Sequence, residues 1–176
     1  MLLMLVTAAS LALAQQTDTT FAVQQGARLK IDNFGGEIVV RTWSEPRVRV
    51  RAEHSSRTTI GITVGPTVVT VQSEGRRGPP QLVDFQLTVP PWMALSLSGV
   101  YTDIALDGVQ APVSGETVEG DITLQGGSGT ITLNSVEGDV TVTGARGRID
   151  VHSVDGTIRI EDAAADIVAE TVDGDI

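Results

Sequence analysis

An 18-residue repeat constrains this chain more than any other feature of its sequence. The segments VEGDITL, VEGDVTV, VDGTIRI and VDGDI begin at residues 118, 136, 154 and 172, so successive copies are 18 residues apart without an insertion. A second series, GTITL, GRIDV and ADIVA, interleaves with the first at the same spacing. A step of 18 residues back from the first copy reaches VYTDIAL at residue 100. The sequence therefore predicts four full repeats, 100–117, 118–135, 136–153 and 154–171, and the start of a fifth.

Each repeat carries two short strands. Apolar and polar residues alternate at residues 122–124 and again at residues 131–133, which is typical of a strand with one buried face. Two such strands cannot bury that face alone, so we expect each residue to stack on the residue 18 positions further along, at a spacing of about 4.8 Å. The predicted fold is all-β: a parallel β-solenoid (β-helix) of 18-residue, two-strand coils.

This stacking predicts five columns of aliphatic side chains that point inward. They are Ile122/Val140/Ile158/Ile176, Leu124/Val142/Ile160, Ile131/Ile149/Ile167, Leu133/Val151/Ala169 and, near a corner, Val100/Val118/Val136/Val154/Val172. One glycine per repeat precedes the first strand, which predicts a corner with positive φ or a close approach of two backbones. These glycines are Gly120, Gly138, Gly156 and Gly174.

Residues 15–99 are less regular but still favour strands. We expect strands around Val23 and within residues 29–31, 38–40, 48–50, 62–72 and 83–89, with a turn at residues 33–36. This part is either a set of irregular coils of the same solenoid or a β-sandwich cap on it. The regular part, residues 100–176, stops inside a repeat at Ile176. We therefore expect a truncated protein whose open edge favours end-to-end self-association.

The first 14 residues are predicted to be a signal peptide. Leu2–Leu13 form an apolar run too short to span a bilayer, and Ala12-Leu13-Ala14 fits the rule for cleavage before Gln15. The run departs from the usual signal-peptide pattern because no Lys or Arg precedes it. The alternative to a signal peptide is that the run forms a buried N-terminal strand or helix. We expect an exported protein of the periplasm, cell surface or extracellular space, without a membrane span after cleavage.

Composition excludes several functions. A net charge of −10 disfavours nucleic acid as a partner. The chain has no Cys and only two His, so disulfides, thiolate catalysis and Cys-ligated zinc are excluded, and we expect no cofactor. Aromatic residues make up 3%, so the core must be aliphatic.

Three segments resemble a known family. They are residues 21–43 (FAVQQGARLKIDNFGGEIVVRTW), residues 87–99 (LTVPPWMALSLSG) and the GDI and GTI repeats from Gly120 onward. Together they are similar to the bacterial putative-adhesin β-strand-repeat family, a domain of unknown function related to the toast-rack envelope domains. The resemblance covers nearly all of the mature chain. It implies a β-solenoid fold and an exported setting in the bacterial envelope, and it carries no catalytic residues.

Acidic side chains recur at the corner of each repeat. Divalent cations are one possible ligand, and turn-forming residues on a solvated corner are the alternative. The candidates for cation contact are Glu119, Asp121, Glu137, Asp139, Asp155 and Asp173. A basic stretch comprises Arg41, Arg47, Arg49 and Arg51, of which the last three should share the solvated face of one strand. It contacts acidic glycans or the acidic corner of this chain itself, or it protects a sheet edge.

The leading functional hypothesis is a non-enzymatic binding, scaffolding or adhesin-like module of the cell envelope. Its partner would be an envelope protein or a glycan. The alternative is a carbohydrate-active β-helix enzyme of the polysaccharide lyase or glycosidase type, which needs a carboxylate pair or a base with Arg in a groove. The residues that would form such a cluster are Arg146, Arg148, Arg159, Asp150 and Asp166.

Overall fold

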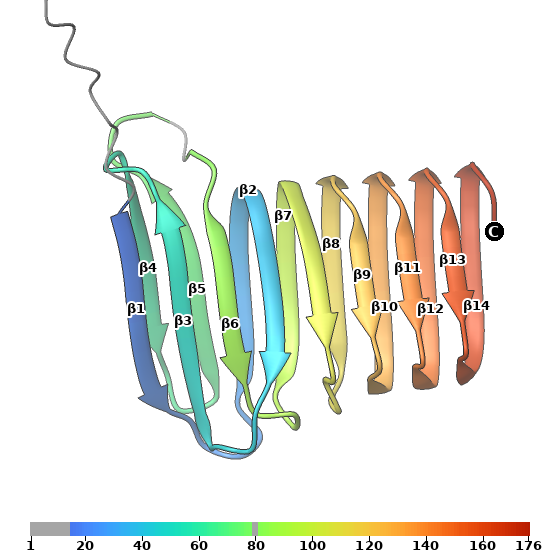
Figure 1. Cartoon of the computed structure of the whole chain (residues 1–176), viewed down its shortest axis with the longest axis horizontal. Coiled ribbons are helices and arrows are strands. Elements are labelled where there is room, and N and C mark those ends of the chain that lie inside the picture. Colours follow the sequence, from blue (N-terminus) through green and yellow to red (C-terminus); the bar gives the residue numbers. More distant parts are fainter. Residues whose placement is uncertain (1–14, 79–80) are drawn as a thin grey trace, which may run out of the picture.

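A computed structural model describes residues 15–78 and 81–176, and the predicted signal peptide lies outside this part. The described residues form 14 strands and no helix (Figure 1). The strands are β1 Gln15–Ala22, β2 Arg28–Thr42, β3 Arg47–His54, β4 Thr58–Val64, β5 Val68–Gly75, β6 Asp84–Val89, β7 Ala94–Asp107, β8 Val113–Glu119, β9 Ile122–Gln125, β10 Ser128–Glu137, β11 Val140–Thr143, β12 Arg146–Asp155, β13 Ile158–Glu161 and β14 Ala164–Asp173. The all-β prediction is confirmed. No described helix is long and apolar enough to cross a membrane.

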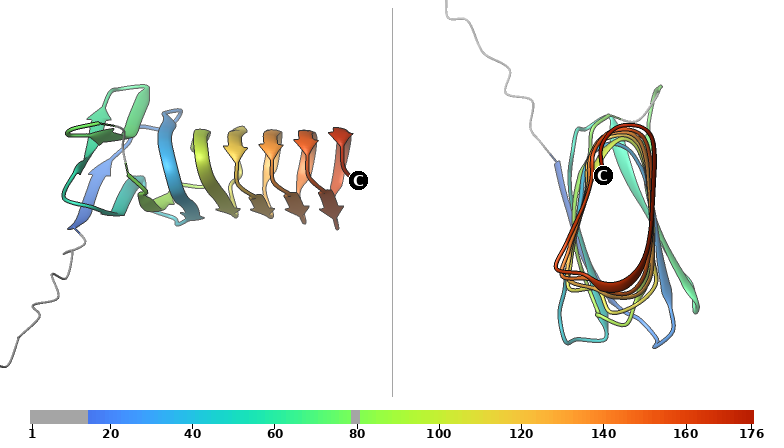
Figure 2. Two further views of the ribbon diagram at one scale, coloured as in Figure 1. Left: turned by 90° about the horizontal axis from the view of Figure 1, so that it is seen from above. Right: turned by 90° about the vertical axis from the view of Figure 1, so that its right-hand side faces the viewer.

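All 14 strands belong to one sheet, which is mixed and not closed. The sheet has two sides because β2 and β7 are long and bend, so that each half pairs with different neighbours. The first side contains β4, β5, β8, β10, β12 and β14 with the first halves of β2 and β7. The second contains β1, β3, β6, β9, β11 and β13 with their second halves. Figure 2, viewed along the long axis, shows the two sides as a flattened loop.

The predicted 18-residue register is confirmed throughout the C-terminal half. Ile131 pairs in parallel with Ile149, and Ile149 with Ile167; Ile122 pairs with Val140 on the other side. Four of the five predicted columns point inward, and their members between Ile122 and Ile158 are at most 1% exposed. Exposure rises in the last repeat, where Ile167 is 45% exposed, because this repeat has a neighbour on one side only.

The fifth column was predicted wrongly. Val118, Val136 and Val154 are 41–44% exposed, and Val172 is more exposed still. The inward positions just before them hold Thr117, Ser135, Ser153 and Thr171. The Thr117 hydroxyl donates to the carbonyl of Thr102 at 2.9 Å, and that of Ser135 donates to Gly120 at 3.3 Å. The hydroxyls of Thr117 and Ser135 thus pair with the backbone at this bend, whereas those of Ser153 and Thr171 have no hydrogen-bond partner among the described residues. With these small side chains pointing inward, strand alternation turns the valines outward.

The glycine prediction is confirmed at the same corner. Gly138 has a φ of 142°, and a Cβ atom there would collide with the carbonyl oxygen of Gly120. Gly120, Gly156 and Gly174 likewise lie against the backbone of the preceding repeat. The repeats can stack at this corner only because these positions have no side chain.

The N-terminal half differs from the prediction in three places. Residues 29–31 and 38–40 lie in the single strand β2, which bends at residues 33–36 instead of turning back. Residues 62–72 are divided between β4 and β5, an antiparallel hairpin closed at Gly65. Strand β3 lies between β1 and β6, so its arginines do not protect a sheet edge.

Candidate binding groove

A groove of about 650 Å³ runs across five successive repeats, beside the exposed valines. Its walls and floor are rows of residues in equivalent positions. The apolar row is Val118, Val136, Val154 and Val172; the polar row is Ser98, Glu116, Asn134, His152 and Glu170; the floor is Gly99, Thr117, Ser135, Ser153 and Thr171. The volume lies in the range of ligand pockets.

Strand alternation builds the groove from a three-residue segment of each repeat. In β10, Asn134 and Val136 point outward and the buried Ser135 lies between them. Asn134 pairs with Glu116 on one side and with His152 on the other, so the polar row follows the stacking direction. The same three positions in β8, β12 and β14 extend both walls without a break.

The apolar row continues toward the N-terminus beyond the groove. Phe34 lies between residues of β2 that pair with Gly99 and Tyr101, and it is therefore level with the half-buried Val100. The rings of Phe34 and Tyr101 meet edge to face, with centroids 5.6 Å apart. Exposed apolar side chains that lie side by side in this way form a candidate contact surface.

Two members of the polar row, Ser98 and His152, contact other side chains of the chain. Ser98 Oγ donates to Asp32 Oδ1 at 2.6 Å, and Asp32 also pairs with Lys30 at 3.2 Å. His152 Nε2 lies 2.8 Å from Asp150, and its Nδ1 lies 3.4 Å from Glu170 in the next repeat. His152 is the one basic residue of the groove lining and is held between two carboxylates.

A second line of carboxylates follows the apolar row. Glu119, Glu137, Asp155 and Asp173, here called the acidic row, pair in register one residue beyond the valines. No Lys or Arg within residues 15–78 and 81–176 forms an ion pair with them. Residues 100–176 hold fifteen of the 22 acidic residues and three of the twelve basic ones, so the groove lies in the acidic half.

The other acidic candidates, Asp121 and Asp139, have a structural role. Oδ1 of Asp121 accepts the backbone N–H of Asp139, and Oδ1 of Asp139 accepts that of Thr157. In the described part of the chain, no group of three or more His, Cys, Asp or Glu side chains could hold a metal ion. Cation binding by the six predicted residues stays a prediction.

The residues proposed for catalysis lie on different strands and on both sides of the sheet. Arg146 and Arg148 lie at the start of β12, whereas Arg159 lies on β13 on the other side of the sheet. Asp150 contacts His152. The structure therefore does not bring the three arginines together around one carboxylate.

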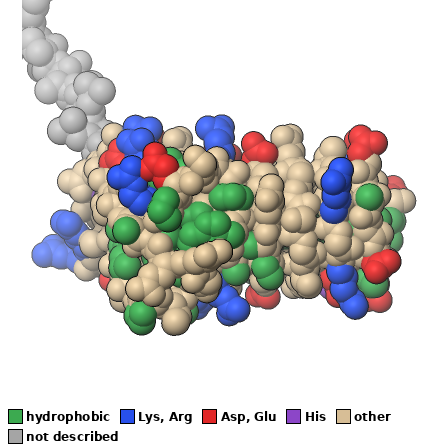
Figure 3. All heavy atoms as spheres, turned by 90° about the horizontal axis from the view of Figure 1, so that it is seen from below, with side chains coloured by type: hydrophobic (Ala, Val, Ile, Leu, Met, Phe, Trp, Pro, Cys, Tyr) green, Lys and Arg blue, Asp and Glu red, His purple; other side chains and the backbone are tan. Residues whose placement is uncertain are grey.

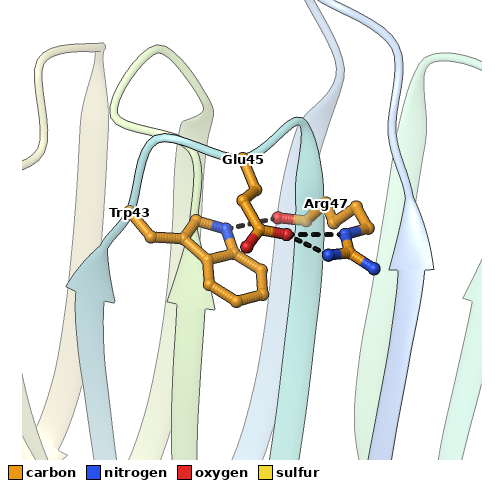
Figure 4. A network of polar contacts seen from close by, with 3 residues as sticks. All are labelled: Trp43, Glu45 and Arg47. Carbon is orange, nitrogen blue, oxygen red and sulfur yellow. Dashed lines mark hydrogen bonds and ion pairs between the residues drawn. The ribbon is translucent and has the colours of Figure 1, made fainter.

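The arginines of β3 form ion pairs with carboxylates of the same chain. Arg49 forms two hydrogen bonds to Asp18 on β1, at 2.9 and 2.6 Å, and Arg51 lies 3.3 Å from the same carboxylate. The hydrogen bond from Arg49 lowers the pKa of Asp18 from its usual 3.8. Arg47 pairs with Glu45, and its carbonyl accepts a 2.8 Å hydrogen bond from Trp43 Nε1 at the turn between β2 and β3 (Figure 4).

Figure 3 shows another face of the molecule. Hydrophobic side chains gather there over the N-terminal half, and charged side chains lie mainly around them and toward the C-terminal end. The groove at the corner is lined by residues in equivalent positions of successive repeats. Two other hollows, beside β9 and at the end of β13, have no such rows across five repeats, so the groove at the corner is the stronger candidate for a binding site.

A solved structure shares the fold at a TM-score above 0.5, and others are similar over most of the chain at lower scores. A putative cell adhesion protein from Clostridium sporogenes has a TM-score of 0.59 and 12% identity, and the match covers 84% of this chain and 99% of that one. A putative adhesin from Bacteroides fragilis has a TM-score of 0.36, 14% identity and coverages of 92% and 97%. One from Parabacteroides distasonis has a TM-score of 0.37, 14% identity and coverages of 94% and 98%. The resemblance to putative adhesins seen in the sequence is thus confirmed among solved structures.

No protein-family model matches the sequence, and no curated protein matches it. At 12% identity, the likeness to the C. sporogenes protein establishes the fold alone. Function must therefore be argued from the groove.

Proposed function

We propose that this protein is a non-enzymatic binding or scaffolding module, adhesin-like, of the bacterial cell envelope. The chain is organised as a parallel β-solenoid that presents one elongated groove. It is exported, and residues 1–14 serve as the signal peptide. The fold likeness to a protein described as a putative cell adhesion protein supports this proposal. The parallel 18-residue register of β8, β10, β12 and β14 supports the solenoid.

The observation that carries the proposal is the continuity of the groove over five repeats. Each repeat contributes one residue to the polar row and one to the floor, and four of the five contribute a valine to the apolar row. The inward aliphatic columns do not require outward valines, each of which leaves apolar surface in water. A surface repeated at intervals of about 4.8 Å suits a long ligand better than a small molecule.

The test measures binding of the purified chain to isolated bacterial envelopes. Val136→Asn combined with Val154→Asn should weaken saturable binding about tenfold or more, because two central members of the apolar row are lost. Val64→Asn is the matched control, since Val64 is 51% exposed on β4 and lies outside the groove. Equal binding by all variants would contradict the proposal. Release of shortened glycans from a polysaccharide panel would establish an enzyme instead.

A further inference from the structure

We propose that the groove binds an extended cationic polypeptide segment in the polyproline II conformation, with a basic residue at every third position. This inference rests on the function proposed above and names the ligand class of the same groove. Four features of the groove support it: its width, its charge, the difference between its walls and the spacing of its repeats.

The width of the groove selects an extended chain. Its walls are residues two positions apart on one strand, such as Asn134 and Val136, and this separation is about 6.6 Å. An α-helix with side chains is about 10–12 Å across and is too wide. Five repeats span about 19 Å from first to last, which is the length of roughly six residues of extended chain.

The charge of the groove selects a cation. Glu116 and Glu170 place carboxylates in the wall formed by the polar row, and the acidic row lies one residue beyond the apolar row, next to the residues that line the groove. Asp155 and its counterparts in the acidic row have no Lys or Arg partner among the described residues. A basic ligand would therefore meet complementary charge, and an anionic lipid surface or acidic glycan would be repelled.

The difference between the walls favours a polypeptide over other thin ligands. An acyl chain would cover Asn134 and Glu116 without offering hydrogen bonds, which costs free energy. A neutral glycan could donate hydroxyl hydrogen bonds to the carboxylates but would bring no complementary charge, and none of the residues lining the groove is an aromatic side chain on which a sugar ring could stack. A polypeptide offers apolar side chains to the valines and peptide groups or cations to the polar row.

The spacing of the repeats selects the polyproline II conformation. This helix has three residues per turn and rises about 9.3 Å per turn, so every third side chain points the same way. Two repeats span about 9.6 Å, and each repeat carries one member of the acidic row. A basic side chain at every third position thus meets the acidic row at alternate repeats. A β-strand, with same-face side chains about 6.7 Å apart, does not keep this match.

The experiment uses fluorescence anisotropy with the full chain and a labelled peptide in which Arg-Pro-Val is repeated three times. A peptide of the same composition with its arginines adjacent should bind about tenfold more weakly, because it loses the match to alternate repeats. A peptide with Glu in place of Arg should show no binding.

Variants assign the binding to the groove. Val136→Asn should weaken binding of the Arg-Pro-Val peptide about fivefold or more, and Val64→Asn should not change it. Glu137→Gln should weaken binding about twofold and reduce its dependence on salt. Glu161→Gln is the matched control, because Glu161 is exposed on β13 and belongs neither to the groove lining nor to the acidic row. Circular dichroism confirms that each variant is folded.

The outcomes distinguish this inference from the proposed function. Equal binding of the two arginine peptides, or no effect of Val136→Asn, would overturn the inference. If neutral oligosaccharides or phosphatidylcholine vesicles bind, and Val136→Asn abolishes that binding, the ligand class is wrong but the groove is still a binding site. If no probe and no envelope preparation distinguishes Val136→Asn from Val64→Asn, both proposals fail.

Discussion

The backbone N–H of Asp139 donates a 2.8 Å hydrogen bond to Oδ1 of Asp121, the residue in the same position of the preceding repeat. Asp103 and Asp121 are related in the same way, at 2.9 Å. A carboxylate that accepts a backbone N–H forms a charge-assisted bond, which is stronger than a bond between neutral groups. These aspartates therefore help to hold one repeat against the next at the corner.

Asp121→Ala is expected to lower the free energy of unfolding by about 1 kcal/mol, because the N–H of Asp139 loses its acceptor and water replaces it only in part. Asp121→Asn keeps a side-chain oxygen and should cost less. Urea unfolding measures both. Asp155→Ala, at the same corner, is the control, since the Asp155 side chain accepts no hydrogen bond in the described part of the chain. An equal loss in Asp121→Ala and Asp155→Ala would contradict the prediction.

Val140→Asp should unfold the neighbouring repeats, with a loss of at least about 3 kcal/mol, because an unpaired carboxylate would be buried between Ile122 and Ile158. Val140→Ile should change stability by less than about 1.5 kcal/mol, since both neighbours are already Ile. Thermal unfolding followed by circular dichroism compares them. An unchanged midpoint in the Asp variant would show that the column does not point inward.

Gly138→Ala should destabilise the chain more than Gly26→Ala. Both glycines have positive φ, so both substitutions carry a backbone cost of about 1 kcal/mol or more. An added Cβ meets nothing within 4 Å at Gly26 but collides with the Gly120 carbonyl at Gly138. The difference between the two losses in urea unfolding isolates the close contact between repeats. Equal losses would mean that the repeats can separate at this corner at no cost.

Asp18 predicts a pH dependence at the N-terminal end. Its pKa is lowered in the folded chain by the hydrogen bond from Arg49, so its contribution to stability is present above about pH 3.8. That contribution is lost as the pH falls through the lower folded-state pKa. Asp18→Asn should therefore lower the unfolding midpoint slightly at pH 7, and the difference from wild type should shrink toward pH 2. Asp107→Asn, at an exposed position, is the control; a difference that grows in acid would reverse the sign and contradict the assignment.

The sequence was sufficient to predict the register of the C-terminal half, because a constant spacing and a period of two together determine which residues stack and which face inward. Neither criterion placed Val136 correctly. Its hydrophobicity suggested burial, but the bend gives the inward position to Ser135, which bonds the backbone. The signal was present as Thr117, Ser135, Ser153 and Thr171, a second column at the same spacing.

The groove was missed for the same reason, since its apolar row was assigned to the interior. The role of Asp121 was also beyond the sequence, because an acidic residue before a strand looks the same whether it binds a cation or the next backbone N–H. In β2, Gly35 and Gly36 indicated a turn, whereas they allow the strand to bend closely past Tyr101 and Val83. Glycine spacing alone does not distinguish a chain reversal from a corner.

The constant 18-residue register also determines how such a surface can change during evolution. Duplication or deletion of one whole unit would alter the length of the groove by about 4.8 Å and leave its cross-section unchanged. Insertion of a single residue would instead exchange the inward and outward faces of the strand that follows. Genes for chains of this kind should therefore differ in length by multiples of 54 nucleotides within the region that encodes Val118 to Asp173. The length of the groove would then change in fixed increments, while the residues that determine ligand preference are retained.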